Sequence, residues 1–355
     1  MDEMTSPRPD TASAGAGADA ADDGASSESW IEQRLGLKGL DYRIPDGAMK
    51  PAYMLGGLTA FFLALLFLTG LYLAQFYNPS PSRAYDSVLY IITRAPMGDW
   101  VRSLHHWASS GVVITVVLHL VLVFARRSYR RPREATWWAG VGMAGLLFLL
   151  LVTGAALRYD QEGFEALAHF VAGGNLTGVI GQFFTEDFTL STPLLPRIFS
   201  LHTSLLPLAI IGLMGLHFWL IRQLGIDAPG ERSTAFRRHA VKLTGLGLLT
   251  WALVGVLAVV APEDLGYAAV AGVEITKPHW PVLWVYGLEN LLGVWGMILG
   301  PTIVFAFLGA VPLLDRGSEE TSGRGVRWTG IALGLVVTAL WLYGVFGEAQ
   351  QHIGM

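Results

Sequence analysis

The sequence has 355 residues, of which 52% are hydrophobic and only 15% charged, and its net charge is −4. Soluble domains usually carry about 25% charged residues. The composition therefore excludes an ordinary soluble protein, and we expect no nucleic-acid partner. Apolar runs of about 20 residues recur along the chain, and each is long enough to cross a bilayer as a helix. We predict an all-α polytopic membrane protein.

The chain has no cysteine. This excludes disulfides, iron–sulfur ligation by thiolates and covalent haem attachment through a CxxCH motif. A redox centre in this chain would have to be held by histidine, methionine or carboxylate side chains.

Residues 1–29 are rich in Ala, Gly, Ser and Asp, and they contain no basic segment followed by an apolar one. We expect them to form a disordered acidic cytoplasmic tail rather than a signal peptide. Apolar and charged residues then alternate from Trp30 to Lys38, which predicts a short amphipathic helix on the membrane surface.

Seven membrane spans are expected after this tail. We place them near residues 53–77, 103–125, 137–157, 197–221, 239–261, 292–313 and 328–346. The loops after the second, fourth and sixth spans are rich in arginine. The positive-inside rule therefore puts these loops and the N-terminus in the cytoplasm, and the C-terminus on the outer side of the cell membrane. Two long outer segments, 158–196 and 262–291, could hold a site or a docking surface.

Four of the histidines within the expected spans form two pairs. His105 and His119 are fourteen residues apart in the second span, and His202 and His217 are fifteen apart in the fourth. At 100° per residue, each pair falls near one helix face, separated by about 21 Å along the axis. Both spans run inward, so His105 can pair with His202 on the outer side and His119 with His217 on the inner side. The pattern predicts two bis-histidine haem-iron sites stacked across a four-helix bundle.

Glycines repeat with the same period in the two neighbouring spans. Gly56 and Gly70 are fourteen residues apart in the first span, and so are Gly140 and Gly154 in the third. A porphyrin edge can approach a helix closely where the helix residue at the same membrane depth has no Cβ atom. These glycines are therefore candidate haem-contact positions. A single intramembrane histidine is often only a polar contact, but four at matching depths favour cofactor binding.

Several segments resemble the cytochrome b/b6 family. The first span contains YMLGGLTAFFLALLFLTG, the second opens with RSLHHW, and the following loop reads RRPREATW. The fourth span contains RIFSLHTSLLPL and LHFWLIRQLGI, while ITKPHW and LLGVWGMILGPTIVFAFLGAVPLLD resemble the smaller subunit of the b6-type complex. The resemblance covers about residues 30–346 and divides the chain into a dihaem bundle, residues 30–228, and a three-helix part, residues 229–355.

The resemblance implies two non-covalent b-type haems, a low-potential haem held by His105 and His202 and a high-potential haem held by His119 and His217. It implies quinol as a substrate and a Rieske-type iron–sulfur protein, a cytochrome c or another redox subunit as partner, and it suggests a homodimer. Arg102 and Arg197 lie near the outer haem depth, where they could pair with propionates or simply reach the interface.

The sequence departs from the family at three informative places. Met54 replaces the cysteine that tethers an extra haem, so no covalent haem is expected. The outer PEWY motif reads Pro278-His279-Trp280-Pro281, and His279 is the candidate proton acceptor in place of the missing glutamate. The family's Pro-Trp pair after the third span is Arg158-Tyr159.

Three functions remain open from the sequence. The first is the cytochrome b subunit of a quinol oxidoreductase that transfers electrons between quinol and a partner redox protein. The second is a dihaem membrane anchor of a dehydrogenase or reductase without bifurcated quinol oxidation, which the altered motif favours. The third is a haem-free structural or transport scaffold. Glu274 and Glu289 are further candidate proton carriers on the outer side.

Overall fold

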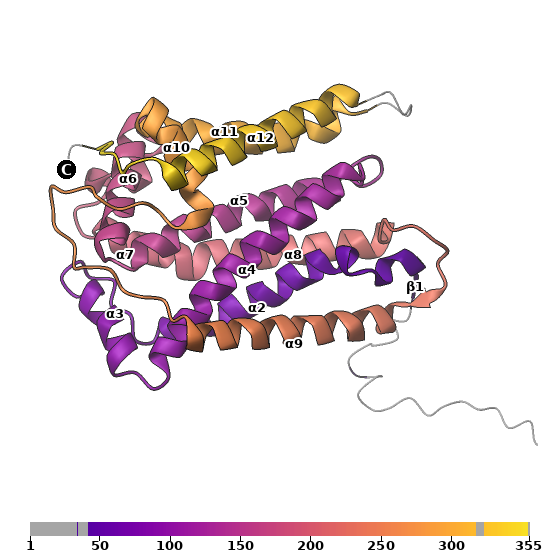
Figure 1. Ribbon diagram of the computed structural model, residues 1–355, viewed down its shortest axis with the longest axis horizontal. Helices are drawn as coiled ribbons and strands as arrows, with labels where there is room; N and C mark the ends of the chain where they lie inside the picture. The colour runs from indigo at the N-terminus through magenta and orange to yellow at the C-terminus, as the bar shows by residue number, and fades with distance from the viewer. Residues whose placement is uncertain (1–33, 35–41, 317–322, 354–355) are drawn as a thin grey trace, which may run out of the picture. The chain divides into compact units, whose positions relative to one another are not determined.

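The computed structural model describes residue 34, residues 42–316 and residues 323–353. The expected tail and surface helix fall outside the described residues, apart from Arg34. The described residues from Arg43 onwards form one compact unit, in which long helices run side by side (Figure 1).

Within the described residues, seven helices are long and apolar enough to cross a membrane, which confirms the expected number. The first combines the 3₁₀ turn η3 (Pro51–Met54) with α2 (Leu55–Leu73), and the fourth combines α7 (Leu194–Ser200), η7 (Leu201–Leu205) and α8 (Leu206–Leu224). The others are α4 (Gly98–Ala125), α5 (Glu134–Leu157), α9 (Phe236–Val260), α11 (Val294–Leu314) and α12 (Arg324–Phe346). The second span begins at Gly98 rather than at residue 103. The carboxylate of Asp99 in its first turn interacts favourably with the positive end of the helix dipole and so stabilises this start.

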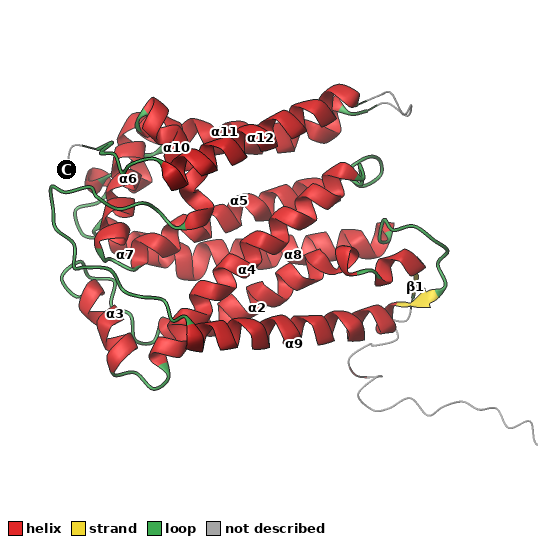
Figure 2. Ribbon diagram, viewed as in Figure 1, coloured by secondary structure: helices red, strands yellow, loops and turns green. Residues whose placement is uncertain are grey.

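The connections at one end of the unit carry their own helices, and we call this the loop-rich end (Figure 2). They include α3 (Ala84–Thr93), α6 (Gln161–Thr177), the 3₁₀ turns η4 (Gly178–Ile180), η5 (Gln182–Phe184), η6 (Glu186–Phe188) and η8 (Trp280–Val282), and α10 (Leu283–Leu292). At the other end, the 3₁₀ turn η2 (Asp46–Met49) follows β1 (Arg43–Ile44), which pairs antiparallel with β2 (Thr234–Ala235).

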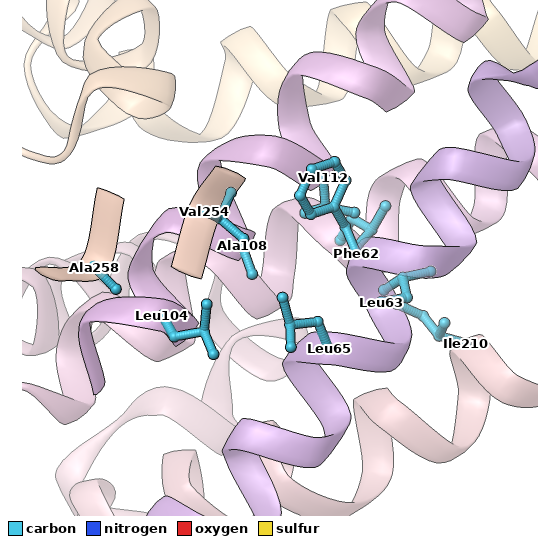
Figure 3. Packing of buried hydrophobic residues seen from close by; sticks show 10 residues of the cluster. Phe62, Leu63, Leu65, Leu104, Ala108, Val112, Ile210, Val254 and Ala258 are labelled. Carbon is cyan, nitrogen blue, oxygen red and sulfur yellow. The ribbon is translucent and has the colours of Figure 1, made fainter. Parts of the chain in front are cut away.

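The largest hydrophobic cluster joins α2, α4 and α9 (Figure 3). Phe62 and Leu65 of α2 meet Leu104 and Ala108 of α4, and Val254 of α9 packs against the same group. The fifth span therefore packs against the first two, while α11 contacts α5 and α6. The C-terminal helices thus lie on two sides of the N-terminal bundle.

The three arginine-rich loops meet at the end opposite the loop-rich end. Arg127 and Arg130, after α4, both bind the carboxylate of Asp315 at the end of α11, with closest N–O distances of 2.7 and 2.6 Å. Tyr129 donates its hydroxyl hydrogen to the same carboxylate, at 2.7 Å. Arg133 donates to the carbonyl oxygen of Leu224, at the end of α8. The connections that follow the second, fourth and sixth spans therefore share one end of the bundle.

Replacing Asp315 with asparagine is expected to destabilise the protein by about 3 kcal/mol, because loss of one partner of a buried ion pair leaves the other charge uncompensated. The carboxylate is fully buried, whereas the two arginines are partly exposed, which keeps the cost at the low end of the usual range. Thermal unfolding in detergent measures the effect. Glu134→Gln is the control, since its partner Arg131 is 88% exposed, and an equal loss of stability in both variants would contradict this account.

Candidate functional site

His105 of α4 and His202 of η7 lie nearer the loop-rich end and line one common cavity. The Nδ1 atom of His105 is 2.8 Å from Thr69 Oγ1, and that of His202 is 3.0 Å from Thr153 Oγ1. Each threonine hydroxyl already donates its single hydrogen to a carbonyl of its own helix, so the hydroxyl oxygen accepts from the histidine Nδ1–H. Both rings therefore carry their hydrogen on Nδ1 and keep a lone pair on Nε2.

A π-helical turn over residues 201–205 explains the unequal histidine spacings. Pro207 follows this turn and lacks the N–H that an α-helix would donate to the carbonyl of Thr203. A π turn accommodates one extra residue in the helix. The fifteen-residue step from His202 to His217 therefore reaches nearly the same face as the fourteen-residue step in α4.

His119 of α4 and His217 of α8 lie further along the bundle, where the His119 ring faces Gly56 of α2 and the His217 ring faces Gly140 of α5. His217 Nδ1 is 3.0 Å from the carbonyl oxygen of Thr136, which can only accept a hydrogen bond. This ring also carries its hydrogen on Nδ1 and leaves Nε2 with a lone pair. His217 thus has the donor atom that an iron ligand requires.

All four expected glycines face the four histidines. A Cβ atom would lie 3.0 Å from the His119 ring at Gly56, 3.5 Å from the His105 ring at Gly70, 3.5 Å from the His217 ring at Gly140 and 2.9 Å from the His202 ring at Gly154. At Gly56 and Gly154 an added Cβ atom would crowd the histidine ring, whereas at Gly70 and Gly140 it would make an ordinary van der Waals contact with the ring.

A cavity of about 310 Å³ extends from the His105–His202 pair towards the loop-rich end. Its apolar wall includes Phe67, Leu150 and Ile210, and its polar wall contains titratable side chains together with Ser109 and Thr203. Besides His105 and His202, the titratable residues are Tyr77, Arg102, His106, Arg158, Glu162, Glu263 and His279. A mainly apolar cavity with a few convergent titratable groups is typical of a small-molecule site.

His279 lies on this polar wall in contact with other titratable side chains. Its ring centroid is 4.7 Å from that of His106, and its Nε2 is 3.4 Å from Ser110 Oγ. His106 Nε2 is in turn 3.2 Å from a carboxylate oxygen of Glu263. Burial, with help from His106, lowers the pKa of His279 to about 4, so the imidazole is neutral and can accept a proton at neutral pH.

Glu162 is one of the polar-wall residues that the sequence did not indicate, with Tyr77, His106 and Glu263. Its carboxylate accepts the backbone N–H of His279 at 3.0 Å and lies 3.2 Å from Arg158. Burial raises the pKa of Glu162 even though Arg158 opposes this shift. Glu162 lies two residues after Asp160, the N-cap of α6. The unusual Arg158 was the available signal, because an arginine at the end of a membrane span, here 22% exposed, is stabilised by acidic partners.

The two candidate propionate partners have protein acceptors in the structure. Arg102 lines the cavity and donates to the carbonyl oxygens of Glu263 and Asp264. Arg197 donates to the carbonyl oxygens of Phe183 and Thr185 and does not line the cavity. Arg102 thus remains near the His105–His202 pair, while Arg197 holds the segment before α7.

Glu274 and Glu289 gather away from the cavity. Neither lines it, and both lie close to His169 of α6. Their carboxylate oxygens are 3.4 and 3.3 Å from His169 Nε2, respectively.

The chain matches known proteins over most of its length. Residues 41–225 match the family model for cytochrome b/b6/petB. Cytochrome b6 from Prochlorococcus marinus subsp. pastoris is 33% identical over 215 residues, which cover 58% of this chain and 99% of that protein. Cytochrome b6 from P. marinus strain MIT 9515 is 33% identical over 208 residues, which cover 56% of this chain and 95% of that protein.

A solved structure described as a hyperthermophilic respiratory Complex III covers 90% of this chain and 91% of its own, with a TM-score of 0.72 and 20% identity. That likeness confirms the expected fold, including the helices beyond residue 225. With the family model and the cytochrome b6 relatives, it leads to one conclusion: this chain belongs to the cytochrome b/b6 family.

Proposed function

We propose that this chain is the dihaem cytochrome b subunit of a membrane quinol oxidoreductase, which transfers electrons between quinol and a partner redox protein across the membrane. The observation that carries the proposal is the set of four histidines at two levels of one bundle, each facing a glycine of a neighbouring helix. A b-type haem supplies one-electron chemistry when it is bound at such a site.

The residues present fit two b-type haems. His105 and His202 would hold the outer haem, and His119 and His217 the inner one. Three of these rings keep Nε2 as a lone-pair donor because a threonine hydroxyl or a carbonyl oxygen accepts from Nδ1. Met54 offers no thiol for a third, covalent haem.

The polar wall of the cavity suits quinol oxidation. Quinol oxidation releases protons, and the neutral imidazole of His279 is placed to accept one. The ring of His106 contacts that of His279, and His106 Nε2 lies within hydrogen-bonding distance of Glu263. These two side chains can therefore carry the proton towards the loop-rich end. Glu162 holds the backbone of His279 in place and can act as a second acceptor.

The proposal also covers the orientation of the chain in the membrane, its redox partners, its dimerisation and the roles of its two parts. The basic end would face the cytoplasm, with the loop-rich end and the C-terminus outside. A Rieske-type protein, a cytochrome c or another redox subunit would dock on the outer side, and two copies of the chain would form a dimer. Residues 30–228 would carry both haems, and residues 229–355 would complete the quinol cavity.

Replacing Gly154 with alanine is expected to lower retention of the outer haem. The added Cβ would lie 2.9 Å from His202 Cε1, and the ring is held by Thr153, so overpacking should cost about 1–3 kcal/mol. Haem content and the redox potential of the purified variant measure the effect. Gly212→Ala in α8 is the control, because nothing lies within 4 Å of the added atom; similar haem loss in both variants would argue against this haem contact.

The test of the function is quinol-dependent haem reduction in the purified complex, followed by turnover with an electron acceptor. Reduction of both haems after mixing with a short-chain quinol supports the proposal. The departure at Pro278-His279-Trp280-Pro281 favours the dihaem-anchor alternative. That alternative would be supported if the haems were reduced only in the presence of a co-purified dehydrogenase.

A further inference from the structure

Four side chains from separate parts of the sequence meet at the loop-rich end, outside the quinol cavity. They are His169 of α6, Glu274 of the connection between α9 and α10, Glu289 of α10, and His352 beyond α12. Single ligand atoms of His169, Glu274 and His352 all lie within 4.8 Å of one another. Glu274 and Glu289 are 5% and 4% exposed, and the His352 side chain is also 4% exposed.

Hydrogen bonds on the far sides of both imidazoles fix which nitrogen faces the cluster. His169 Nδ1 is 2.7 Å from the carbonyl oxygen of Glu165, so it must donate. His352 Nε2 is 2.7 Å from Asn290 Oδ1 and donates to it. In their neutral forms, the two rings therefore turn lone pairs on His169 Nε2 and His352 Nδ1 towards the centre.

These lone pairs face carboxylate oxygens. His169 Nε2 is 3.4 Å from Glu274 Oε1 and 3.3 Å from Glu289 Oε1, and His352 Nδ1 is 3.0 Å from Glu274 Oε1. Glu274 Oε2 is already occupied, since it accepts the backbone N–H groups of His352 and Ile353. Glu289 Oε1 is buried and has no hydrogen-bond partner among the described residues. Acceptor atoms that face one another away from water need a cation between them.

We propose that His169, Glu274, Glu289 and His352 bind a divalent transition-metal ion, with Zn²⁺ as the best match. Tetrahedral zinc binds nitrogen and oxygen ligands at about 2.0–2.2 Å, which separates neighbouring ligand atoms by about 3.3–3.5 Å. The separations of His169 Nε2 from Glu289 and Glu274, 3.3 and 3.4 Å, lie in this range, and that of His352 Nδ1 from Glu274, 3.0 Å, is slightly shorter. The two carboxylates balance the charge of the ion, and two imidazoles with carboxylates are common zinc ligands.

The partners behind the imidazoles match those of known metal sites. A ligating histidine usually donates its other ring N–H to a carbonyl or carboxylate, which orients the ring. The carbonyl of Glu165 and the side-chain amide of Asn290 have this role here. The ion would connect His352, beyond the last span, to α6 and to the segment that leads from Glu274 to His279. It would thereby fix one wall of the quinol cavity without taking part in its chemistry.

The experiment measures metal in the purified, haem-containing complex by mass spectrometry after exposure to ZnCl₂ and removal of loosely bound ions. We expect about one Zn²⁺ per chain, with zinc X-ray absorption giving nitrogen and oxygen ligands at about 2.0–2.2 Å. Glu274→Gln should lose the ion. Asn290→Ala, a milder change that preserves all four ligands, should weaken zinc binding by about 10-fold or more.

His239→Gln is the matched control, because His239 is also buried and its Nδ1 lies 3.0 Å from a backbone carbonyl oxygen, that of Ala48. It should retain the zinc of the unaltered protein. Absence of zinc from the unaltered complex even at saturating ZnCl₂ would overturn the proposal and leave a cluster of hydrogen-bonded imidazoles and carboxylates. Equal zinc content in the unaltered protein, Glu274→Gln and Asn290→Ala would also overturn it.

Discussion

His202→Ala is expected to reduce the haem content of the purified protein from about two to about one per chain, since bis-histidine iron cannot keep its coordination without one imidazole. The remaining haem should be the one between His119 and His217. Accumulation of the protein in the membrane should also fall, because the bundle would then surround an empty, plate-shaped cavity, and such cavities are destabilising.

His239→Ala is the control for this result. His239 is buried, whereas the four candidate ligands are partly buried, and it lies in the first turn of α9, where its Nδ1 is 3.0 Å from the carbonyl oxygen of Ala48. It should keep about two haems per chain. Full haem content in His202→Ala would contradict the ligand assignment, whatever the yield of protein.

His279→Ala is expected to slow quinol-dependent turnover by about 10²-fold, the usual contribution of a general base, while haem content stays unchanged. Because burial lowers the pKa of His279 to about 4, the imidazole is neutral through the physiological range. Turnover should therefore fall as pH falls towards 4, where His279 becomes protonated and can no longer accept a proton. Steady-state rates between pH 4 and 8 measure this dependence.

Two further variants define the role of the polar wall. His279→Glu restores the residue type of the family motif and should keep most of the turnover. Tyr267→Phe, in the same connection, is the control, because the side chain is 88% exposed and lies outside the cavity lining. Unchanged turnover in His279→Ala would rule out His279 as the acceptor and leave Glu162 as the candidate.

The sequence predicted the membrane spans and the paired histidines because both depend on strong local signals. Apolar runs of about 20 residues have few alternatives to a membrane helix. The fourteen-residue spacing fixes two side chains on one helix face. The glycines opposite the histidines followed from the same period, and the structure places each of them against a histidine ring.

Other parts of the site depended on tertiary contacts that a single sequence does not encode locally. The π turn at residues 201–205 was not foreseen, although Pro207 removes a helix hydrogen bond there. Glu162 reaches the cavity from the first turn of α6, where its carboxylate accepts the backbone N–H of His279. The cluster of His169, Glu274, Glu289 and His352 combines residues up to 183 positions apart, counted from 169 to 352, and no short motif indicates it.

The most direct test of the central claim is the reduced-minus-oxidised visible spectrum of the purified protein, with haem quantified as the pyridine haemochrome. The account predicts b-type spectra and about two haems per chain, consistent with non-covalent histidine-ligated haem. A protein that folds and accumulates normally but contains no haem would contradict the assignment of all four histidines, and with it the electron-transfer function.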